Sequence, residues 1–257
     1  MQTPTIPTVF SLSDIISSYS ESKSILLFED DRNDVFLHVK EKQADDFSEP
    51  ARISKGDFSI IVDGTYTFFI DNHEPIKPSA KDIVYIPKNI GYYSKITSGE
   101  TSESSGSRLS IYPKNTGSPA AKSQIKTDKN NEPPNMLLTS YRLLTELALK
   151  QRKYTIIEND INSLFSISDS PKTSSQGHWH FDFDEWWYIP KGNLEFKVGE
   201  NRPLLKTKAG DVVYVPKGFR HQITTLGTEP SIRMPVTTLD NVHIWTDEDD
   251  SAPPPKH

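Results

Sequence analysis

The chain has 257 residues, of which 34% are hydrophobic, 25% charged and 10% aromatic, a composition typical of a globular protein with room for two domains. The formal net charge of -6 argues against nucleic-acid binding, and the absence of cysteine excludes disulfide bonds and thiolate metal ligands. The N-terminal residues lack a basic and apolar leader, and no segment approaches the roughly 18 consecutive apolar residues of a membrane span. We therefore expect a cytoplasmic protein that does not bind membranes.

Two segments have the residue spacing of amphipathic helices. The first, residues 12–19, is short, whereas the second, residues 136–152, has apolar residues every three or four positions and predicts about four turns. The remaining chain consists mainly of short apolar stretches bounded by turn residues. This pattern favours β-strands arranged as a sandwich or a barrel.

The strand pattern occurs twice along the chain. Residues 80–92 (AKDIVYIPKNIGY) align with residues 209–221 (AGDVVYVPKGFRH), so the same turn, apolar strand and proline-containing turn recur in the same order. Upstream of these segments, Gly64 and Gly192 each precede a strand of alternating polarity. The sequence therefore predicts a tandem duplication of one β-rich unit.

Changes in composition divide the chain into four predicted segments. Residues 1–113 form the N-terminal unit and residues 137–245 the C-terminal unit. Residues 114–136, rich in Lys, Asn, Ser, Pro and Gly, are predicted to be an exposed linker. Residues 246–257 are acidic and then proline-rich, which is typical of a loosely attached tail.

A candidate metal site lies in the C-terminal unit. Side chains alternate along a strand, so His178 and His180 point to the same face while Trp179 points to the other. Glu185 follows a short turn and begins the next strand, and His221 follows a second turn that contains Pro and Gly. A lone His-x-His pair is more often a surface or structural feature. The combined spacing of all four residues predicts a site with His178, His180, Glu185 and His221 as metal ligands.

These segments resemble the two sequence motifs of the cupin superfamily. The first motif reads HWHFDFDEWWYIPKG at residues 178–192, and the second reads GDVVYVPKGFRH at residues 210–221. Two positions depart from the pattern: Gly177 is adjacent to the first histidine instead of six residues earlier, and Thr225 replaces a terminal asparagine. Neither is a ligand position. The resemblance implies an all-β fold of tandem jelly-roll β-barrels, a bicupin, with a few short helices.

The first unit lacks the metal motif. A nearly constant repeat offset of 128 to 129 residues transfers the four ligand positions onto Pro50, Arg52, Asp57 and Tyr92, of which only Asp57 could bind a metal. We therefore expect a metal-free first barrel that supports the second. The alternative is a vestigial pocket for a small molecule.

Several residues near the predicted ligands are candidates for contact with a substrate. Trp187 and Phe196 are expected to wall an apolar pocket. Arg220, Gln222 and Arg233 are the polar candidates, although strand alternation places Gln222 on the face opposite the neighbouring His221.

Two carboxylates in the turn between the ligands are candidate proton shuttles. Asp182 and Asp184 could equally be solvated turn residues, and Asp184 is the fallback ligand if the loop closes one residue earlier. The remaining histidines have no partners at ligand spacing and are interpreted as ordinary surface, core or tail residues; they are His38, His73, His243 and His257.

The ligand set narrows the chemistry without selecting one reaction. Imidazole and carboxylate ligands that leave open positions suit Fe(II), which we favour, and also Mn(II), Ni(II), Cu(II) or Zn(II). We expect a small enolic, aromatic or carboxylic substrate and a dioxygenase-type oxidoreductase. One alternative is an O₂-independent isomerase, decarboxylase or cyclase, and another is a non-enzymatic protein that binds a small molecule. The two barrels could pack together in one chain or pair with a second chain as a homodimer.

Overall fold

The computed structural model describes residues 4–42, 52–97, 105–114, 135–199 and 203–245. Nearly all of the predicted linker at residues 114–136 and all of the predicted tail at 246–257 lie outside the described residues. The described parts are mainly β-strands with two short helices, which confirms the predicted all-β class. None of the described helices is long and apolar enough to cross a membrane.

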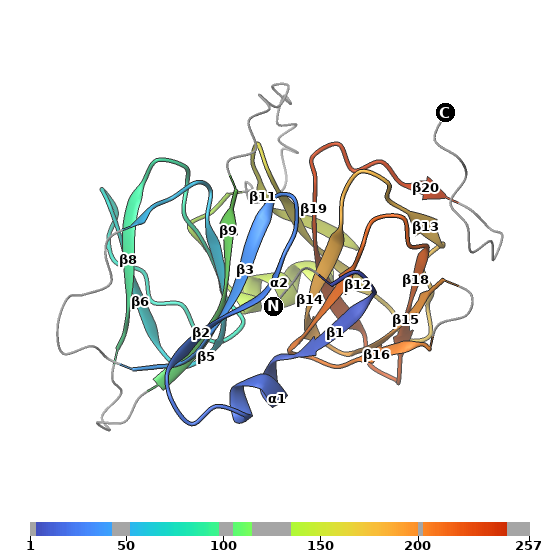
Figure 1. Cartoon of the computed structure of the whole chain (residues 1–257), viewed down its shortest axis with the longest axis horizontal. Helices are drawn as coiled ribbons and strands as arrows, with labels where there is room; N and C mark the ends of the chain where they lie inside the picture. The colour runs from blue at the N-terminus through green and yellow to red at the C-terminus, as the bar shows by residue number, and fades with distance from the viewer. Residues whose placement is uncertain (1–3, 43–51, 98–104, 115–134, 200–202, 246–257) are drawn as a thin grey trace. The chain divides into compact units, whose positions relative to one another are not determined.

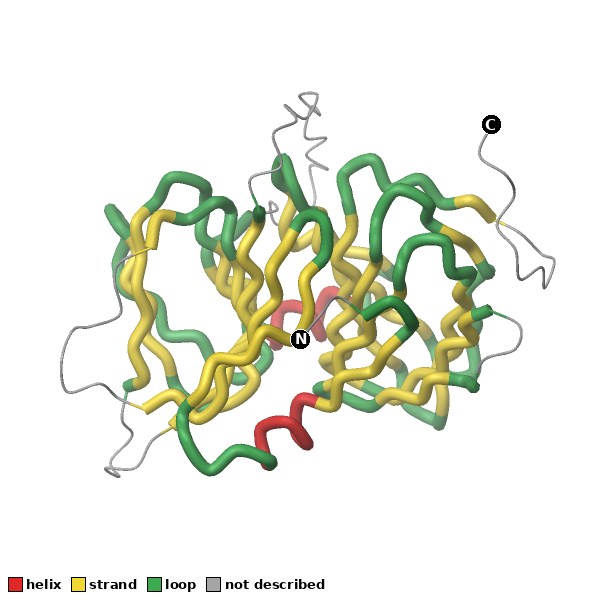
Figure 2. The backbone as a smooth tube through the Cα atoms, in the orientation of Figure 1, coloured by secondary structure: helices red, strands yellow, loops and turns green. Residues whose placement is uncertain are grey.

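The chain folds into two compact units, and each contains two β-sheets (Figures 1 and 2). The first unit comprises the described parts of Asp14–Glu146 together with Ile156–Ile161. The second comprises the described parts of Thr3–Ser13 and Asn162–His257, together with Leu147–Thr155.

The first unit has a six-stranded and a three-stranded sheet. Their strand orders are β10-β7-β5-β9-β3-β2 and β4-β8-β6. The strands are β2 (Lys23–Glu29), β3 (Asn33–Lys42), β4 (Arg52–Ile53), β5 (Phe58–Asp63), β6 (Tyr66–Ile70), β7 (Ile83–Tyr85), β8 (Gly91–Ile96), β9 (Ser105–Pro113) and β10 (Leu138–Thr139). Alternate side chains of both sheets meet in an apolar core that includes Ile61, Phe68, Val84, Tyr92 and Ile96.

The second unit has a six-stranded and a five-stranded sheet. Their strand orders are β1-β17-β14-β19-β12-β11 and β16-β15-β18-β13-β20. The strands are β1 (Thr8–Ser11), β11 (Lys153–Glu158), β12 (Ser163–Asp169), β13 (His178–Trp179), β14 (Glu185–Lys191), β15 (Asn193–Val198), β16 (Leu205–Thr207), β17 (Asp211–Val215), β18 (His221–Leu226), β19 (Ser231–Thr237) and β20 (Ile244–Trp245). The core includes Trp187, Leu194, Phe196, Val213 and Ile223.

The two larger sheets have the same strand order. From one edge to the other, β7, β5, β9, β3 and β2 of the first unit correspond to β17, β14, β19, β12 and β11 of the second. Backbone angles also repeat: Lys81 has a φ of 70° where Gly210 has 94°, and Asn89 has 66° where Gly218 has 84°. Positive φ is uncommon for residues other than glycine, so the turns agree in conformation even where the residue type differs.

One edge strand of each larger sheet comes from the half of the sequence that forms the other unit. Strand β1 pairs with β17 of the second unit, and strand β10 pairs with β7 of the first. The predicted boundaries at residues 1–113 and 137–245 therefore need correction at these two segments. An edge strand joins a sheet through backbone hydrogen bonds, so its sequence does not reveal which of two similar sheets it enters.

The helices agree with the prediction in position but not always in length. Helix α1 (Leu12–Ser17) falls in the predicted segment, whereas α2 (Tyr141–Ala148) is half as long as the predicted helix at residues 136–152. The Ser140 hydroxyl accepts a hydrogen bond from the Leu143 amide at 3.2 Å and so caps the start of α2. The apolar residues before this cap belong to β10 and pack on the first core.

Candidate metal centre

The four predicted ligands come from both sheets of the second unit. His178 on β13 lies directly opposite His221, the first residue of β18. His180 follows β13, and Glu185 is the first residue of β14 in the other sheet. The barrel therefore brings together residues that are separated by up to 43 positions in the sequence, from 178 to 221.

Backbone hydrogen bonds hold the two ligand-bearing turns together. The amide of Gly218 donates to the carbonyl oxygen of His180 at 2.7 Å. The amide of Lys217 donates to Oδ1 of Asp184 at 2.8 Å. These bonds tie the turn before His221 to the loop that carries the other ligands, so the positions of all four are set before any ion binds.

The ligand side chains converge on one buried point. Their donor atoms all lie within 4.8 Å of one another, and the most exposed of the four, His178, has only 7% of its surface accessible. Oε2 of Glu185 lies 2.8 Å from Nε2 of His180 and 3.2 Å from Nε2 of His221. Neighbouring ligands on an octahedral ion with bonds of about 2.1 Å are about 3.0 Å apart, so the observed separations suit a metal.

The second nitrogen of each imidazole has a backbone partner. The Nδ1 atoms of His178, His180 and His221 lie 3.1, 3.2 and 3.2 Å from the carbonyl oxygens of Gln176, Val242 and Phe219, respectively. A carbonyl oxygen can only accept, so each Nδ1 carries the proton and each Nε2 of a neutral ring presents a lone pair. The three imidazoles are thus held in the tautomer that a metal requires.

This arrangement leaves buried acceptors without donors. Nε2 of His180, Nε2 of His221 and Oε2 of Glu185 are buried and have no hydrogen-bond partner. Lone pairs that face one another in a dry site repel unless a cation lies between them, and unpaired buried polar atoms are costly. The donor set therefore fits a divalent metal ion.

The ionisation states agree with this interpretation. Burial, together with a smaller effect of the neighbouring His221, lowers the pKa of His178 to about 2. Burial by itself would raise the pKa of Glu185, but positive charge and N–H donation at His180 and His221 outweigh this effect and hold its pKa well below the usual range. A cation between neutral imidazoles would lower the pKa of Glu185 in the same direction. An ionised carboxylate beside a neutral imidazole is the form in which both side chains bind metals.

Aromatic side chains enclose the ligands on the barrel side. Trp187 packs edge-on against His221, with ring centroids 5.1 Å apart, and against Phe196 at 5.2 Å. Phe183 lies 4.4 Å from the ring of His180. Trp187 thus contacts a ligand directly and Phe196 contacts Trp187, and their role in walling a substrate pocket stays a prediction.

Strand β20 and the residue before it bring two further aromatic side chains, Trp245 and His243, next to the ligands. Trp245 lies opposite His178 in the β13–β20 pair. The ring of His243 stacks on Trp245 and lies 4.6 Å from the ring of His178 and 4.7 Å from that of His180. His243 is therefore not part of the ligand cluster but packs against two of its members. No local spacing links it to the ligands, because its position depends on strand pairing across 65 residues, from 178 to 243.

The two turn carboxylates occupy different surroundings. Both oxygens of Asp184 accept hydrogen bonds, Oδ1 from the Lys217 amide and Oδ2 from the Tyr214 hydroxyl at 2.7 Å, so this side chain stabilises the turn and lies outside the ligand cluster. Asp182 is exposed to solvent. The structure does not bring either group into the ligand set.

The three polar candidates for substrate contact, Arg220, Gln222 and Arg233, also have different surroundings. The guanidinium of Arg220 lies against Gly177, where an added Cβ would stand 2.0 Å from Nη2. Gln222 donates to the Ser175 carbonyl oxygen at 3.0 Å, on the face away from His221 as alternation predicts. A Cβ at position 177 would require the Arg220 guanidinium to move, so the glycine next to the first ligand accommodates the close approach of Arg220.

Arg233 has the surroundings of a buried functional group. It is 3% exposed, forms an ion pair with Asp169, and its Nε has no hydrogen-bond partner. Burial lowers the pKa of Arg233, while the charges of Asp169 and, less strongly, Glu185 raise it. The field of Glu185 therefore reaches this guanidinium.

Equivalent positions in the first unit carry no comparable ligand set. Arg52 on β4 lies opposite Tyr92 on β8, as His178 lies opposite His221. The amide of Asn89 donates to the carbonyl oxygen of Ser54 at 2.8 Å, which reproduces the bond from Gly218 to His180.

Strand register then completes the correspondence. Phe58 pairs with Tyr85 as Trp186 pairs with Tyr214, so Asp57 occupies the position of Glu185. The ligand positions are thus Arg52, Ser54, Asp57 and Tyr92.

The constant offset was wrong for the first two positions. Glu185 lies five positions after His180, but Asp57 lies only three positions after Ser54. The assignments to Pro50 and to Arg52 are therefore shifted by two residues, and Pro50 itself lies outside the described residues.

Comparisons with known proteins agree with this architecture. Residues 167–237 match the family model described as the cupin domain. A cupin 2 conserved barrel domain protein from Leptotrichia buccalis has 14% identity and a TM-score of 0.66, and the alignment covers 90% of this chain and 96% of that one. No curated protein sequence is significantly similar to this chain.

Two enzymes are among the similar structures. A salicylate 1,2-dioxygenase from Pseudoaminobacter salicylatoxidans has 11% identity and a TM-score of 0.62, with 90% of this chain and 83% of that one covered. An oxalate decarboxylase from Bacillus subtilis, which has Mn(II) centres, has 14% identity and a TM-score of 0.53, with 92% and 78% covered. At this identity the likeness concerns the fold.

The fold and the ligand cluster define a two-barrel protein with one candidate metal centre of three histidines and one glutamate. The family match identifies the second barrel further: residues 167–237 match the cupin domain family, and the fold of the chain is similar to that of a cupin 2 barrel protein.

Proposed function

We propose that the second barrel is a metal-dependent enzyme centre for a small enolic, aromatic or carboxylic substrate, and that its reaction is an oxidation of the dioxygenase type. The observation that carries this proposal is the buried set of His180, His221 and Glu185 atoms that face one another without hydrogen-bond partners. A structural ion would need only a closed four-ligand shell, whereas three histidines and one carboxylate suit ions that accept further ligands.

When bound, the metal would act as a Lewis acid with redox capacity and would leave up to two positions for substrate and O₂. Fe(II) is the ion we favour, and Mn(II), Ni(II) and Zn(II) are the alternatives. The three histidines and Glu185 would hold the ion. The backbone carbonyls bonded to the imidazoles keep the rings oriented.

The aromatic wall keeps the reacting groups dry. Trp187 is 2% exposed and Phe196 is fully buried, so water has little access to the ligands from the barrel interior. A low local dielectric strengthens the interaction between the ion and an anionic substrate oxygen. This environment favours a substrate that coordinates through an enolate, a phenolate or a carboxylate.

Arg233 is the residue we assign to substrate orientation. Its buried guanidinium has an unused Nε and keeps its charge in a site that already contains the carboxylates Asp169 and Glu185. Arginine binds carboxylates through paired hydrogen bonds, so Arg233 would position a substrate carboxylate. Arg220, Asp182, Asp184 and Gln222 have weaker cases because of the contacts and exposure described above.

An O₂-independent reaction is the second candidate. The chain is also similar in fold to an oxalate decarboxylase, and the same ligand set could stabilise an anion without oxidising it. The partly buried His243, which contacts two ligands, is the polar group that the structure adds to such a scheme.

The test is turnover by the full-length protein loaded anaerobically with Fe(II) or Mn(II). We expect salicylate-like hydroxy acids or 1,3-dicarbonyl enols to cause oxygen uptake with Fe(II), and His180→Ala to abolish it. His73→Ala is the matched control because His73 is exposed in the first unit. Product formation under strict anoxia would support the second candidate, and a loaded protein that converts neither class would count against both.

A further inference from the structure

The first barrel contains a cavity of about 190 Å³. Its lining includes His38, Arg52, Tyr92, Ser94, Arg108 and Tyr112. Two of these residues, Arg52 and Tyr92, occupy the positions that His178 and His221 have in the second barrel. The cavity thus lies where the duplicated scaffold has its metal centre in the other unit.

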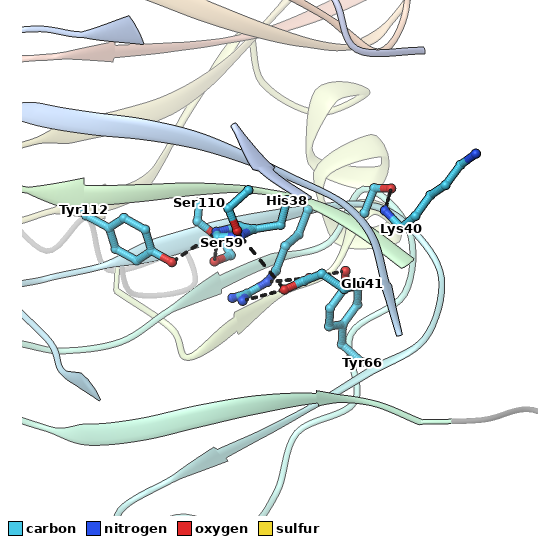
Figure 3. Close-up of polar contacts among 10 residues, drawn as sticks. His38, Lys40, Glu41, Ser59, Tyr66, Ser110 and Tyr112 are labelled. Atoms are coloured by element: carbon cyan, nitrogen blue, oxygen red, sulfur yellow. Dashed lines mark hydrogen bonds and ion pairs between the residues drawn. The ribbon is translucent and has the colours of Figure 1, made fainter. Parts of the chain in front are cut away.

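Positive groups face the cavity. Arg108 is 3% exposed, and its Nε and Nη2 donate to the two carboxylate oxygens of Glu41 at 3.0 and 3.1 Å. The Tyr66 hydroxyl also donates to Glu41, at 2.7 Å, and Figure 3 shows these two side chains turned toward each other. Glu41 is thus held by Arg108 and Tyr66, and it is not among the described residues that line the cavity.

Arg52 is the second cationic group. Its Cζ lies 3.8 Å from the centre of the Tyr112 ring, and about half of its side chain is exposed. Its Nε is 3.9 Å from Oδ2 of Asp57, which already accepts a hydrogen bond from the Tyr92 hydroxyl at 2.8 Å. The ion pair with Asp57 is therefore long, and the flat face of the Arg52 guanidinium is fixed by stacking on a tyrosine.

His38 adds a polar contact without adding charge. Burial lowers its pKa to about 4, and the charge of Arg108 contributes to the same effect. Nδ1 of His38 lies 2.8 Å from Oγ of Ser24, and Nε2 lies 3.3 Å from the Tyr112 hydroxyl (Figure 3). The neutral imidazole thus orients a tyrosine hydroxyl at the cavity wall.

We propose that the first barrel is a binding site for a small carboxylate that carries one planar ring. Arg52 provides the forked donors that a carboxylate accepts, while the fork of Arg108 is already bonded to Glu41 and contributes a buried positive group to the wall. The tyrosine rings provide flat apolar surface for the ring. A cavity of about 150 Å³ can hold benzene, so the available volume suits a single ring with a carboxylate. This site is separate from the metal centre and does not depend on the proposed reaction.

The experiment is a calorimetric titration of the full-length protein with benzoate, and with benzamide as the uncharged analogue. We expect saturable binding of benzoate at millimolar concentrations, weaker binding of benzamide, and a loss of affinity of about tenfold or more in Arg52→Met, since hydrogen bonds to charged groups contribute that much. Arg52→Lys should bind with intermediate affinity because it keeps the charge but not the fork. Arg142→Met is the matched control, because that side chain is 88% exposed on α2.

Further arms separate this site from the metal centre. Benzoate binding should persist in His180→Ala, which removes a metal ligand from the other barrel. All four tryptophans, Trp179, Trp186, Trp187 and Trp245, are in the second unit, so binding to the first barrel should leave tryptophan fluorescence unchanged. The proposal is overturned by an absence of saturable benzoate binding, by equal binding of benzamide, or by binding that His180→Ala abolishes and Arg52→Met does not. The activity assays of the metal centre have no bearing on these outcomes.

Discussion

The two barrels have a carboxylate at the same position, but its pKa is shifted in opposite directions. In the second barrel, Glu185 is held ionised by His180 and His221, and its pKa lies well below the usual range. In the first barrel, burial raises the pKa of Asp57, although hydrogen bonds from the Lys55 amide and the Tyr92 hydroxyl partly oppose this shift. The same backbone therefore supports two electrostatic environments.

The difference lies in what surrounds each carboxylate. Asp57 accepts hydrogen bonds from the Lys55 amide and the Tyr92 hydroxyl and lies 3.9 Å from Arg52, whereas Oε2 of Glu185 faces the Nε2 atoms of His180 and His221, which present lone pairs when these rings are neutral. Arg52 and Tyr92 of the first barrel occupy the positions that His178 and His221 have in the second barrel. We therefore expect a metal ion only in the second barrel, where the side chains of the chain leave the carboxylate unsatisfied.

The largest expected effect comes from converting one barrel toward the other. His221→Tyr places the residue type of Tyr92 at the ligand position, so the carboxylate would gain a hydroxyl donor and lose a metal ligand. We expect the metal content, measured by elemental analysis after gel filtration with Fe(II) or Zn(II), to fall from about one ion per chain to near zero.

Two controls interpret this result. His73→Tyr changes an exposed histidine of the first unit and should keep the metal. His221→Ala covers the case in which tyrosine disturbs packing against Trp187, and near-ultraviolet circular dichroism checks that the fold is kept. A His221→Ala protein that is folded and fully loaded would contradict the ligand assignment.

A smaller effect is expected from the buried ion pair of the first barrel. Arg108→Met leaves Glu41 without its main partner, and removing one member of a buried pair costs about 3–5 kcal/mol of unfolding free energy. Replacing both residues, as Glu41→Gln with Arg108→Met, should restore part of this loss because no unpaired charge remains.

Urea unfolding followed by circular dichroism provides the measurement for this pair. Arg142→Met should change the unfolding free energy by less than about 0.5 kcal/mol, as exposed substitutions usually do. If Arg108→Met and Arg142→Met had equal unfolding free energies, the ion pair between Arg108 and Glu41 would not stabilise the first barrel. The proposed electrostatic difference between the two barrels would then be contradicted.

Local patterns were sufficient to predict the cluster of four candidate metal ligands and the all-β duplicated fold. His178 and His180 share a face because of strand alternation, and Glu185 and His221 each follow a turn whose residues are specific. Turn conformation and the alternation of side chains along a strand depend on only a few neighbouring residues. The positions of these four side chains could therefore be predicted from a single sequence.

Features that depend on distant strand pairing were not predicted. His243 contacts His178 only because β20 pairs with β13. The edge strands β1 and β10 have only four and two residues, which is too short for their sequence to select between two similar sheets. Constant-offset alignment failed at Arg52 because loop length, unlike strand length, varies freely between repeats.

The smallest expected effect compares neutral histidines in the two barrels through their pH dependence. The pKa of His38 is about 4 in the folded protein and about 6.5 in the unfolded chain, so the unfolded state binds more protons between these values. The contribution of His38 to stability is therefore complete above about pH 6.5, decreases as the pH falls toward 4, and changes no further below that.

Replacing His38 isolates this contribution from that of the second barrel. The unfolding free energy of the wild type should fall more steeply between about pH 7 and pH 4 than that of His38→Gln, by up to about 3 kcal/mol over the interval. His178 and Glu41 are present in both proteins, so their titration cancels in the comparison, and His73→Gln should keep the wild-type slope. Equal slopes for the wild type and His38→Gln would show that burial and Arg108 do not hold His38 neutral, and the assignment of an uncharged imidazole to the wall of the first cavity would be wrong.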